Sequence, residues 1–543
     1  MGWPLRILLC LLPLSGLAAA QQPAAACTTE TVRTTTGSVC GLSVERSGNQ
    51  VNQWLGIPYA EPPVGELRWH DPVALAPWQG VLQATAVGNI CPQTPNPLRI
   101  PGAAEAAAQS EDCLTLNIWA PAADPDGLLP VLVYIHGGAF THGSSTDSPM
   151  PGSDWYLQDG SFLAAGGQAL VVSFNYRLGA LGFLANAGAT GLQGNFGFRD
   201  QLVALQWLRE NLEVFGGDPQ RVTLAGESAG AMSVGLHLLA TESSSHYFQA
   251  AIMQSNPLGV QFRTLEQTKG SGDAFLLSTG CLLSFNQLEC LRGLPVEDIL
   301  DSQENWSLTL DVLDAGLQGI LPWAPVVDGT LITGQPLALG LGNGSSKPLL
   351  IGHTAEEGLL FVSFALADPV SPVVRQALVD VLFGSDPAGS IRDSYPDDPE
   401  GDPRESLAGI IDDAVFICPA LALASATRPV PAYVYEFSHP PGFDLDLNIE
   451  PCSGRSCHAT ELSFVFGTAG IEVGFSEEEA ELSRQMGAYW LAFVTSRGAA
   501  AAMAPWPVWT DAQRDRFDFA IPNAIRRAEG HNCDLWHEWL ESL

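Results

Sequence analysis

Positive charge is scarce in this sequence. Its 543 residues include 24 Lys and Arg against 59 Asp and Glu, and the formal net charge is −35 at pH 7. Nucleic acids and anionic lipid surfaces repel such a polyanion, so we expect neither as a partner. Charged residues make up only 15% of the chain and hydrophobic residues 46%, which argues against wholesale disorder and provides for a buried core.

Long apolar runs are also few. Residues 7–17 are apolar, follow Arg6 and lead to three alanines at 18–20, a small-residue site of the kind that signal peptidase cleaves. The run is shorter than the roughly 20 residues that a membrane span needs, and no later stretch looks long and charge-free enough to span. We therefore predict that residues 1–20 are a signal peptide and that residues 21–543 form a secreted or periplasmic protein without an integral membrane segment. Lipid attachment at Cys27 is the alternative.

Cysteine motifs with zinc spacing are absent, so we expect no metal site. Removal of the signal peptide leaves ten cysteines, an even number that suits disulfides in an oxidising compartment. Sequence alone does not fix their pairing. Spacing along the chain suggests five pairs, the last of which would tie the C-terminal helix to the body: Cys27–Cys40, Cys91–Cys113, Cys281–Cys290, Cys452–Cys457 and Cys418–Cys533.

Runs of β-branched and alternating apolar residues predict strands, and a stripe of apolar residues at helical spacing predicts a helix over Asn195–Phe215. Alternating strands and helices indicate an α/β protein whose mostly parallel sheet is covered on both faces. We expect Ser394–Ser406, rich in Asp, Pro and Glu, to be a surface loop, with a domain linker as the alternative. The predicted strands are Leu114–Trp119, Val131–Ile135, Leu170–Asn175, Val222–Ala225, Ala250–Gln254, Leu349–Gly352 and Tyr433–Phe437.

Residues 226–230 read GESAG, a G-x-S-x-G motif placed between a predicted strand and an apolar helical stretch. This context is the one that a nucleophile elbow requires, so Ser228 is the candidate nucleophile. A serine at its free pKa is a poor nucleophile, so the motif also predicts a base, an acid that orients the base and an oxyanion hole. The turn HGGAF at 136–140 supplies two candidate oxyanion donors, the amides of Gly138 and Ala139, and the amide of Ala229 would be the third.

With further motifs, these segments resemble the type-B carboxylesterases, the family of the cholinesterases and the animal and fungal esterase-lipases. The motifs span nearly all of residues 21–543: GIPYA at 56–60, EDCL at 111–114, NYR at 175–177, GNFG at 194–197 and FGGDP at 215–219. The resemblance implies a single α/β-hydrolase domain over residues 21–543, with a large, mostly parallel central sheet and helices on both faces. It implies a serine esterase that needs no cofactor.

The resemblance also implies the acid and the base. The acid falls in AEEG at 355–358, where the register selects Glu357 and leaves Glu356 as the alternative. The base falls in CHATEL at 457–462 and is His458; His136 competes, although its place before two glycines suits shaping of the oxyanion loop. Ser228, Glu357 and His458 then follow the chain order nucleophile, acid, base of this fold.

Other family features concern support and substrate. The resemblance implies a structural ion pair between Glu111 and Arg68. The Cys452–Cys457 ring, which departs from the cholinesterase pattern, would either stiffen the loop of the base or be a generic staple. Cholinesterases hold a quaternary ammonium on a Trp within the first disulfide loop, but the Cys91–Cys113 loop has no aromatic residue, so choline esters are not the expected substrate. That loop is either a hydrophobic lid or a plain surface loop.

The expected activity is therefore that of a secreted serine carboxylesterase that hydrolyses small-molecule or lipid esters through an acyl-enzyme. A lipase acting on longer-chain acylglycerols is one alternative. A non-catalytic adhesion or binding protein of the same fold is another, although such relatives have lost the nucleophile that this chain retains.

Overall fold

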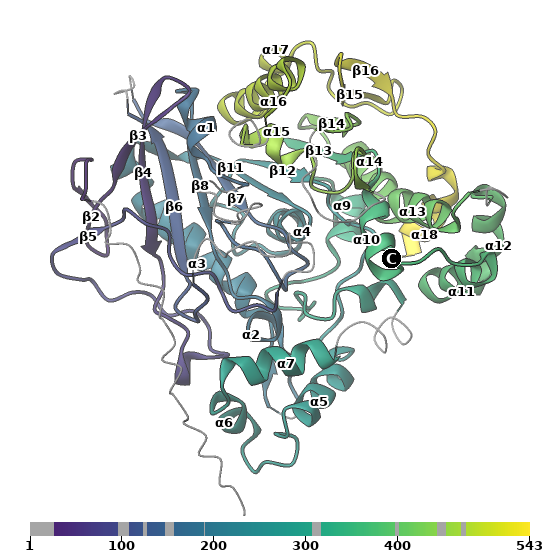
Figure 1. The fold of residues 1–543 in the computed structure, drawn as a ribbon, viewed down its shortest axis with the longest axis horizontal. Helices are drawn as coiled ribbons and strands as arrows, with labels where there is room; N and C mark the ends of the chain where they lie inside the picture. Colours follow the sequence, from purple (N-terminus) through teal and green to yellow (C-terminus); the bar gives the residue numbers. More distant parts are fainter. Residues whose placement is uncertain are drawn as a thin grey trace, which may run out of the picture.

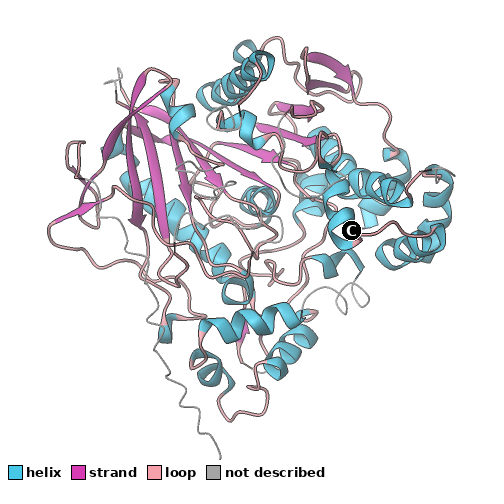
Figure 2. Cartoon of the chain, in the orientation of Figure 1, coloured by secondary structure: helices cyan, strands magenta, loops and turns pink. Residues whose placement is uncertain are grey.

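The computed structural model describes residues 26–95, 108–122, 127–146, 157–188, 190–306, 316–396, 401–442, 452–468 and 474–542. The predicted signal peptide and the central part of the Cys91–Cys113 loop, which is expected to be either a lid or a plain surface loop, lie outside these ranges. Within them, helices surround one large sheet (Figures 1 and 2).

The large sheet has eleven strands in the order β16-β15-β14-β13-β12-β11-β7-β8-β6-β4-β3. The run from β8 to β15 is parallel, whereas β16 at one edge and β6, β4 and β3 at the other pair antiparallel. The sheet is therefore mixed, with a parallel centre. Its strands are β3 Leu42–Arg46, β4 Asn49–Pro58, β6 Thr115–Pro121, β7 Leu129–Ile135, β8 Leu170–Phe174, β11 Gly217–Glu227, β12 Ala250–Gln254, β13 Leu349–Thr354, β14 Ala432–Phe437, β15 Asp515–Phe519 and β16 Ala524–Arg527.

Seven of these strands lie where the sequence predicts them, and β12 has the predicted bounds. The antiparallel pairs β3–β4 and β15–β16 were not predicted. Five short strands lie outside the large sheet, in a three-stranded and a two-stranded sheet: β1 Val32–Arg33, β2 Ser38–Cys40, β5 Val81–Gln83, β9 Ala185–Asn186 and β10 Leu192–Gln193.

Both faces of the sheet are buried. In β7, Val131, Val133 and Ile135 belong to one apolar cluster, whereas Leu132 and Tyr134 belong to another, as expected when alternate side chains of a strand point to opposite faces. Residues of α3 (Phe196–Asn211) and α4 (Ala229–Gly235) pack in the first cluster, and residues of α1 (Ser161–Ala165), α15 (Leu462–Phe466) and α16 (Glu477–Ser496) in the second. The predicted two-sided cover is present.

Other helices extend this core. Figure 1 shows α5, α6 and α7 grouped at one end of the molecule, near α2. In the predicted loop Ser394–Ser406, residues 395–402 connect α12 to α13, and residues 403–406 already belong to α13; residues 397–400 lie outside the described ranges. The remaining helices are α2 Gly179–Phe183, α5 Thr268–Ser278, α6 Gln287–Arg292, α7 Val296–Trp306, α9 Pro336–Asn343, α10 Glu357–Ala365, α11 Pro372–Phe383, α12 Ser385–Ser394, α13 Pro403–Ile411, α14 Cys418–Ala426, α17 Ala500–Met503 and α18 Cys533–Ser542.

The predicted helix over Asn195–Phe215 is shorter than expected. The α-helix α3 covers Phe196–Asn211, and a 3₁₀ turn over Leu212–Phe215 completes the segment. Gly216 follows with φ 88°, a left-handed conformation that favours glycine and ends the helical stretch before β11.

One helical stretch is more apolar than the sequence reading allowed. Pro403–Ala426, which joins α13, a π-helical turn over Asp412–Ile417 and α14, is long and apolar enough to cross a membrane by length and composition alone. The expectation that no later stretch meets this test was therefore wrong. However, 78% of its most apolar window is buried inside the molecule, as in a core helix of a soluble protein.

Five disulfide bonds staple the fold, between the same pairs that the spacing suggests: Cys27–Cys40, Cys91–Cys113, Cys281–Cys290, Cys418–Cys533 and Cys452–Cys457. Several disulfides in one chain are consistent with an extracellular protein.

Arg68 and Glu111 form a two-pronged ion pair near the Cys91–Cys113 bond. Arg68 Nε donates to Glu111 Oε1 and Arg68 Nη2 to Glu111 Oε2, both at 2.7 Å. Arg68 also donates to the carbonyl of Leu294, 2.8 Å away, in the connection between α6 and α7. The pair therefore links the N-terminal strands to this outlying group of helices.

Candidate active site

Ser228 is the single residue between β11 and α4. Its backbone has φ 54° and ψ −124°, a conformation that residues with a side chain rarely adopt. The turn is so tight that a Cβ on Gly226 would lie 2.4 Å from the backbone of Gly230, and a Cβ on Gly230 would lie 2.1 Å from the carbonyl oxygen of Ile135. Both positions therefore require glycine. The strand, turn and helix have the order that the GESAG motif predicts.

The loop after β7 faces this turn. Gly138, Ala139 and Phe140 all have positive φ (103°, 53° and 60°), so the chain reverses within three residues. A Cβ on Gly137 would lie 3.1 Å from the Cβ of Ser228, which places the loop directly beside the candidate nucleophile. Among the described residues, the amides of Gly138, Ala139 and Ala229 donate to no protein acceptor. All three expected oxyanion donors therefore have an N–H available to a ligand.

His458 lies against Glu357. The imidazole Nδ1 and Glu357 Oε2 are 2.5 Å apart, and both side chains are buried. The other carboxylate oxygen of Glu357 accepts a hydrogen bond of 2.7 Å from the backbone N–H of Thr354, which fixes the carboxylate at the start of α10. The rings of Phe361 and Phe416 pack on the imidazole at centroid distances of 4.8 and 5.4 Å. The ring is therefore held on one edge by a carboxylate and on its sides by aromatic residues.

The free edge of the imidazole faces the nucleophile turn. His458 Nε2 lies 3.0 Å from Oε1 of Glu227, the residue directly before Ser228. Both residues are in the described part of the chain, yet the structure gives no hydrogen bond between the Ser228 hydroxyl and His458 Nε2. The structure thus brings the base to the elbow and to the acid, with Glu227 as its immediate neighbour there.

A third carboxylate completes the surroundings of the base. Glu461, three residues after His458, is buried and accepts hydrogen bonds from Gln254 Nε2 (3.1 Å) and Tyr435 Oη (3.4 Å). Gln254 in turn accepts a hydrogen bond of 3.1 Å from Trp490 Nε1. The ends of β11 and β12 and the loop of His458 therefore meet in one buried polar network.

The carboxylates control the charge of this network. Burial lowers the pKa of His458, but the nearby carboxylates of Glu227, Glu357 and Glu461 outweigh burial and raise it from 6.5 to about 9. Burial raises the pKa of Glu227 from 4.5 to about 8, against the opposing charge of His458. Burial and the charge of Glu357 raise the pKa of Glu461 to about 7. The cluster therefore binds protons more tightly than the same groups do in water.

The two competing assignments have different surroundings. His136 stacks on Tyr176 with a centroid distance of 4.4 Å, and its Nδ1 lies 2.9 Å from the carbonyl oxygen of Gly137. Burial lowers its pKa to about 4, so it is neutral at physiological pH. Glu356 points away from His458 and bonds to Arg455 and the Ser456 amide. His136 therefore shapes the loop, and it is Glu357 that contacts the imidazole.

Glu227 and Glu461 were missed in the sequence reading. Both occur inside the quoted motifs, GESAG and CHATEL, and the only available signal was a carboxylate within an otherwise small or apolar segment. Their importance comes from being buried together around one imidazole, which depends on the fold.

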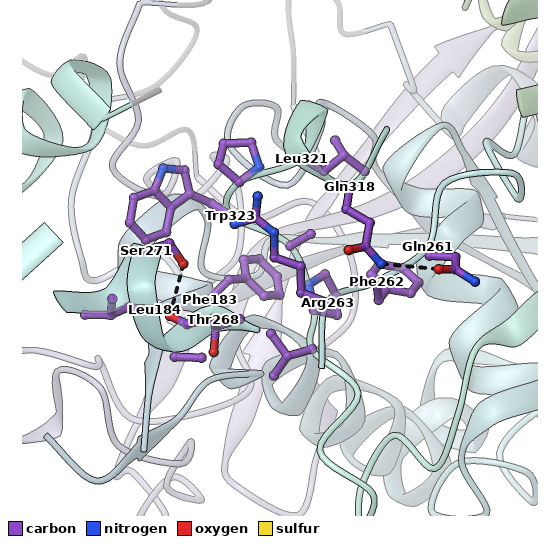
Figure 3. A pocket seen from close by; sticks show the side chains of 16 residues that line it. Phe183, Leu184, Gln261, Phe262, Arg263, Thr268, Ser271, Gln318, Leu321 and Trp323 are labelled. Carbon is purple, nitrogen blue, oxygen red and sulfur yellow. Dashed lines mark hydrogen bonds between the residues drawn. The ribbon is translucent and has the colours of Figure 1, made fainter. Parts of the chain in front are cut away.

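A pocket adjoins the oxyanion loop. Phe140 contacts Phe183 and Phe262 edge-on, with centroid distances of 5.3 and 6.2 Å, and both of these rings line the pocket in Figure 3. Gln318 donates to Gln261 at its rim, 3.3 Å away. Its walls also include Leu184, Arg263, Leu321 and Trp323. The pocket therefore combines aromatic and aliphatic residues with the polar side chains of Gln261, Arg263, Thr268, Ser271 and Gln318.

In the described ranges, no group of three or more His, Cys, Asp or Glu side chains is placed to hold a metal ion. The arrangement can instead perform acid–base and nucleophilic chemistry with protein groups alone: a serine at a strained turn, a histidine between carboxylates, and three unpaired amides.

Comparison with known proteins agrees with this chemistry. The profile of the group described as the carboxylesterase family matches residues 28–536. The para-nitrobenzyl esterase of Bacillus subtilis is 36% identical over 475 residues, which cover 86% of this chain and 91% of that protein. The acetylcholinesterase of Bungarus fasciatus is 35% identical over 545 residues, covering 94% and 86%. The cAMP-regulated D2 protein of Dictyostelium discoideum is 36% identical over 453 residues, covering 82% and 80%.

A solved structure of a PNB esterase superposes with a TM-score of 0.78 at 33% sequence identity, covering 94% of this chain and 100% of that one. The chain therefore belongs to the carboxylesterase family, has the α/β-hydrolase fold and is a carboxylic ester hydrolase.

Proposed function

We propose that this protein is a secreted serine carboxylesterase that works through an acyl-enzyme. In this proposal Ser228 is the nucleophile, His458 the base and Glu357 the acid that orients it. The amides of Gly138, Ala139 and Ala229 form the oxyanion hole. Residues 1–20 are the signal peptide, and residues 21–543 form a single domain.

One observation carries the proposal. A buried histidine bonds to the carboxylate of Glu357 on one edge and presents its other nitrogen to the turn that holds Ser228, 3.0 Å from the preceding residue. The three residues come from separate parts of the chain, so their convergence is a property of the fold. A structural ion pair would not need the strained serine or the three unpaired amides beside it.

The proposed reaction follows from these positions. His458 takes the proton of Ser228 as the serine oxygen attacks the ester carbonyl, and Glu357 stabilises the imidazolium that forms. The three amides bind the oxyanion, where a single donor is typically worth about 3 kcal/mol. His458 then gives its proton to the leaving alcohol. Water attacks the acyl carbonyl while His458 takes its proton, and His458 returns that proton to the Ser228 oxygen as the acid leaves.

We propose small-molecule esters as substrates. Choline esters are not the expected class, since the Cys91–Cys113 loop has no aromatic residue to hold a quaternary ammonium.

Labelling and hydrolysis test the proposal together. A fluorophosphonate should modify Ser228, and a series of p-nitrophenyl esters of increasing chain length should be hydrolysed with one preferred length. Ser228→Ala should lower kcat by at least about 10³-fold, whereas the exposed Ser243→Ala should not. Absence of labelling together with absence of hydrolysis would support the non-catalytic binding alternative.

A further inference from the structure

The loop that carries His458 is joined to the segment that carries Glu357 by contacts of Glu356. Glu356 and Cys457 form an isolated parallel β-bridge, in which the amide of Glu356 donates to the carbonyl of Ser456 over 3.1 Å. The side chain adds two bonds. Glu356 Oε2 accepts from the Ser456 amide (3.0 Å), and Glu356 Oε1 accepts from Arg455 Nε (2.6 Å). Three hydrogen bonds therefore connect the two segments directly beside the acid–base pair.

The partner segment is itself a closed ring. The Cys452–Cys457 disulfide links residues only five positions apart, and the amide of Arg455 donates to the carbonyl of Cys452 over 3.1 Å within it. Cys457 is fully buried and directly precedes His458. The position of this ring therefore determines the position of the His458 backbone, from which the imidazole extends.

The ion pair contributes little to stability. The side chains of Glu356 and Arg455 are 28% and 37% exposed, and ion pairs at that exposure are weak because water screens them. Each carboxylate oxygen of Glu356 nevertheless accepts a hydrogen bond from the ring, and the two bonds together fix the distance and orientation of the ring relative to Glu356. The contact is thus better suited to placing the ring than to stabilising the fold.

We propose that Glu356 is a positioning residue, which with Arg455 and the Cys452–Cys457 ring holds the base of this esterase in register with its acid. The inference rests on the proposed roles of His458 and Glu357. Glu356 does not touch the imidazole, so it acts through Ser456 and Cys457. A displacement of about 1 Å in a catalytic group can lower turnover about 100-fold, which makes such a placement important for the rate.

Glu356→Gln is the direct test. A carboxylate accepts on both oxygens, whereas an amide turns its NH2 group toward one of the two donors, so one bond is lost. We expect kcat to fall about 10-fold, with KM within twofold of the wild type and the melting temperature nearly unchanged. Glu405→Gln is the matched control. Glu405 accepts from Nη1 of the same arginine (3.1 Å) but does not bond to the ring backbone, so its kcat should not change.

The ring gives a second, independent test. The double variant Cys452→Ser with Cys457→Ser should lower kcat at least 10-fold. The double variant Cys281→Ser with Cys290→Ser opens a disulfide of sequence separation 9 far from the site and should leave kcat unchanged. The two double variants should lose similar amounts of melting temperature, because the loop-closure entropy that a disulfide removes from the unfolded chain depends only weakly on loop length.

The pH profile separates placement from general destabilisation. Contact with Glu357 helps to raise the pKa of His458, so a displaced imidazole should titrate at lower pH in the Glu356 and ring variants but not in the two controls. The positioning role is refuted if Glu356→Gln and the ring variant keep the kcat and the pH profile of the wild type. The esterase proposal still stands in that case, provided that the wild type is active and His458→Ala is inactive. An inactive and unlabelled wild type would instead overturn the proposed function.

Discussion

Replacing Glu227 by Gln should make the enzyme active at lower pH. Glu227 Oε1 lies 3.0 Å from His458 Nε2, and among the charges that raise the pKa of His458 it is the largest. That pKa rises from 6.5 to about 9 although burial opposes the rise. The four main raising interactions are Glu227, the charge and the hydrogen bond of Glu357, and Glu461. Because Glu227 is the largest of them, replacing its carboxylate by a neutral amide should lower the pKa of His458; a charge within about 4–6 Å typically shifts a pKa by about 1 unit or more.

The assay is kcat/KM for a p-nitrophenyl ester between pH 5 and 10, whose lower limb reports the free enzyme's base. Because only neutral imidazole accepts the serine proton, activity should rise with pH through this limb. In Glu227→Gln the limb should move down by about 1 pH unit. Glu478→Gln, which removes one exposed carboxylate on α16, controls for net charge. A limb that stays in place or moves up would show that Glu227 does not set the proton affinity of the base.

Three further changes test other parts of the structure. Burial lowers the pKa of His237 to about 3, so its neutral form stabilises the fold above pH 6.5 and that stability is lost as pH falls toward 3. Chemical denaturation at a series of pH values should show this loss in the free energy of unfolding. A free energy of unfolding that stays constant over this range, in the wild type and in His237→Gln alike, would contradict the prediction. Gly138→Ala should lower kcat about 100-fold in ester hydrolysis, because the residue has φ 103° and its new Cβ would lie 2.2 Å from the carbonyl oxygen of His142. A normal kcat would exclude this loop from the oxyanion hole. Glu111→Gln leaves the buried Arg68 without its charged partner and should cost about 3 kcal/mol in urea unfolding, whereas Glu66→Gln, at a carboxylate that is 92% exposed, should cost under about 1 kcal/mol; equal losses would contradict the burial argument.

The centre of the fold was predictable because its local signals agree with its environment. Strands such as β7 and β12 are buried on both faces and read as continuous apolar runs, and the GESAG turn lies between such a strand and a helix. The proposed triad residues were predicted from the GESAG motif and, for Glu357 and His458, from the segments that the resemblance selects.

The edges of the sheet were not predictable by the same reasoning. In β4 the register shifts between Trp54 and Ile57, and an irregular strand loses the alternation that marks a half-buried one. In β15, Arg516 and Asp518 interrupt the apolar pattern; both are buried, and both pair with charged residues on neighbouring strands. Charges whose partners lie far away in the sequence cannot be recognised from local sequence. The same reason explains why Glu227 and Glu461 were missed.

The arrangement of the disulfides has a consequence for synthesis. Four bonds join cysteines that follow one another along the chain, and in three of these no earlier cysteine of residues 21–543 is still unpaired when the second cysteine emerges. The Cys452–Cys457 bond, in contrast, is nested inside Cys418–Cys533, whose partners are 115 residues apart. Oxidation in order of emergence would join Cys418 to Cys452, which leaves Cys457 to react with Cys533. Correct maturation of this half therefore depends on delayed oxidation or on an isomerase, and recombinant yield should be limited there first.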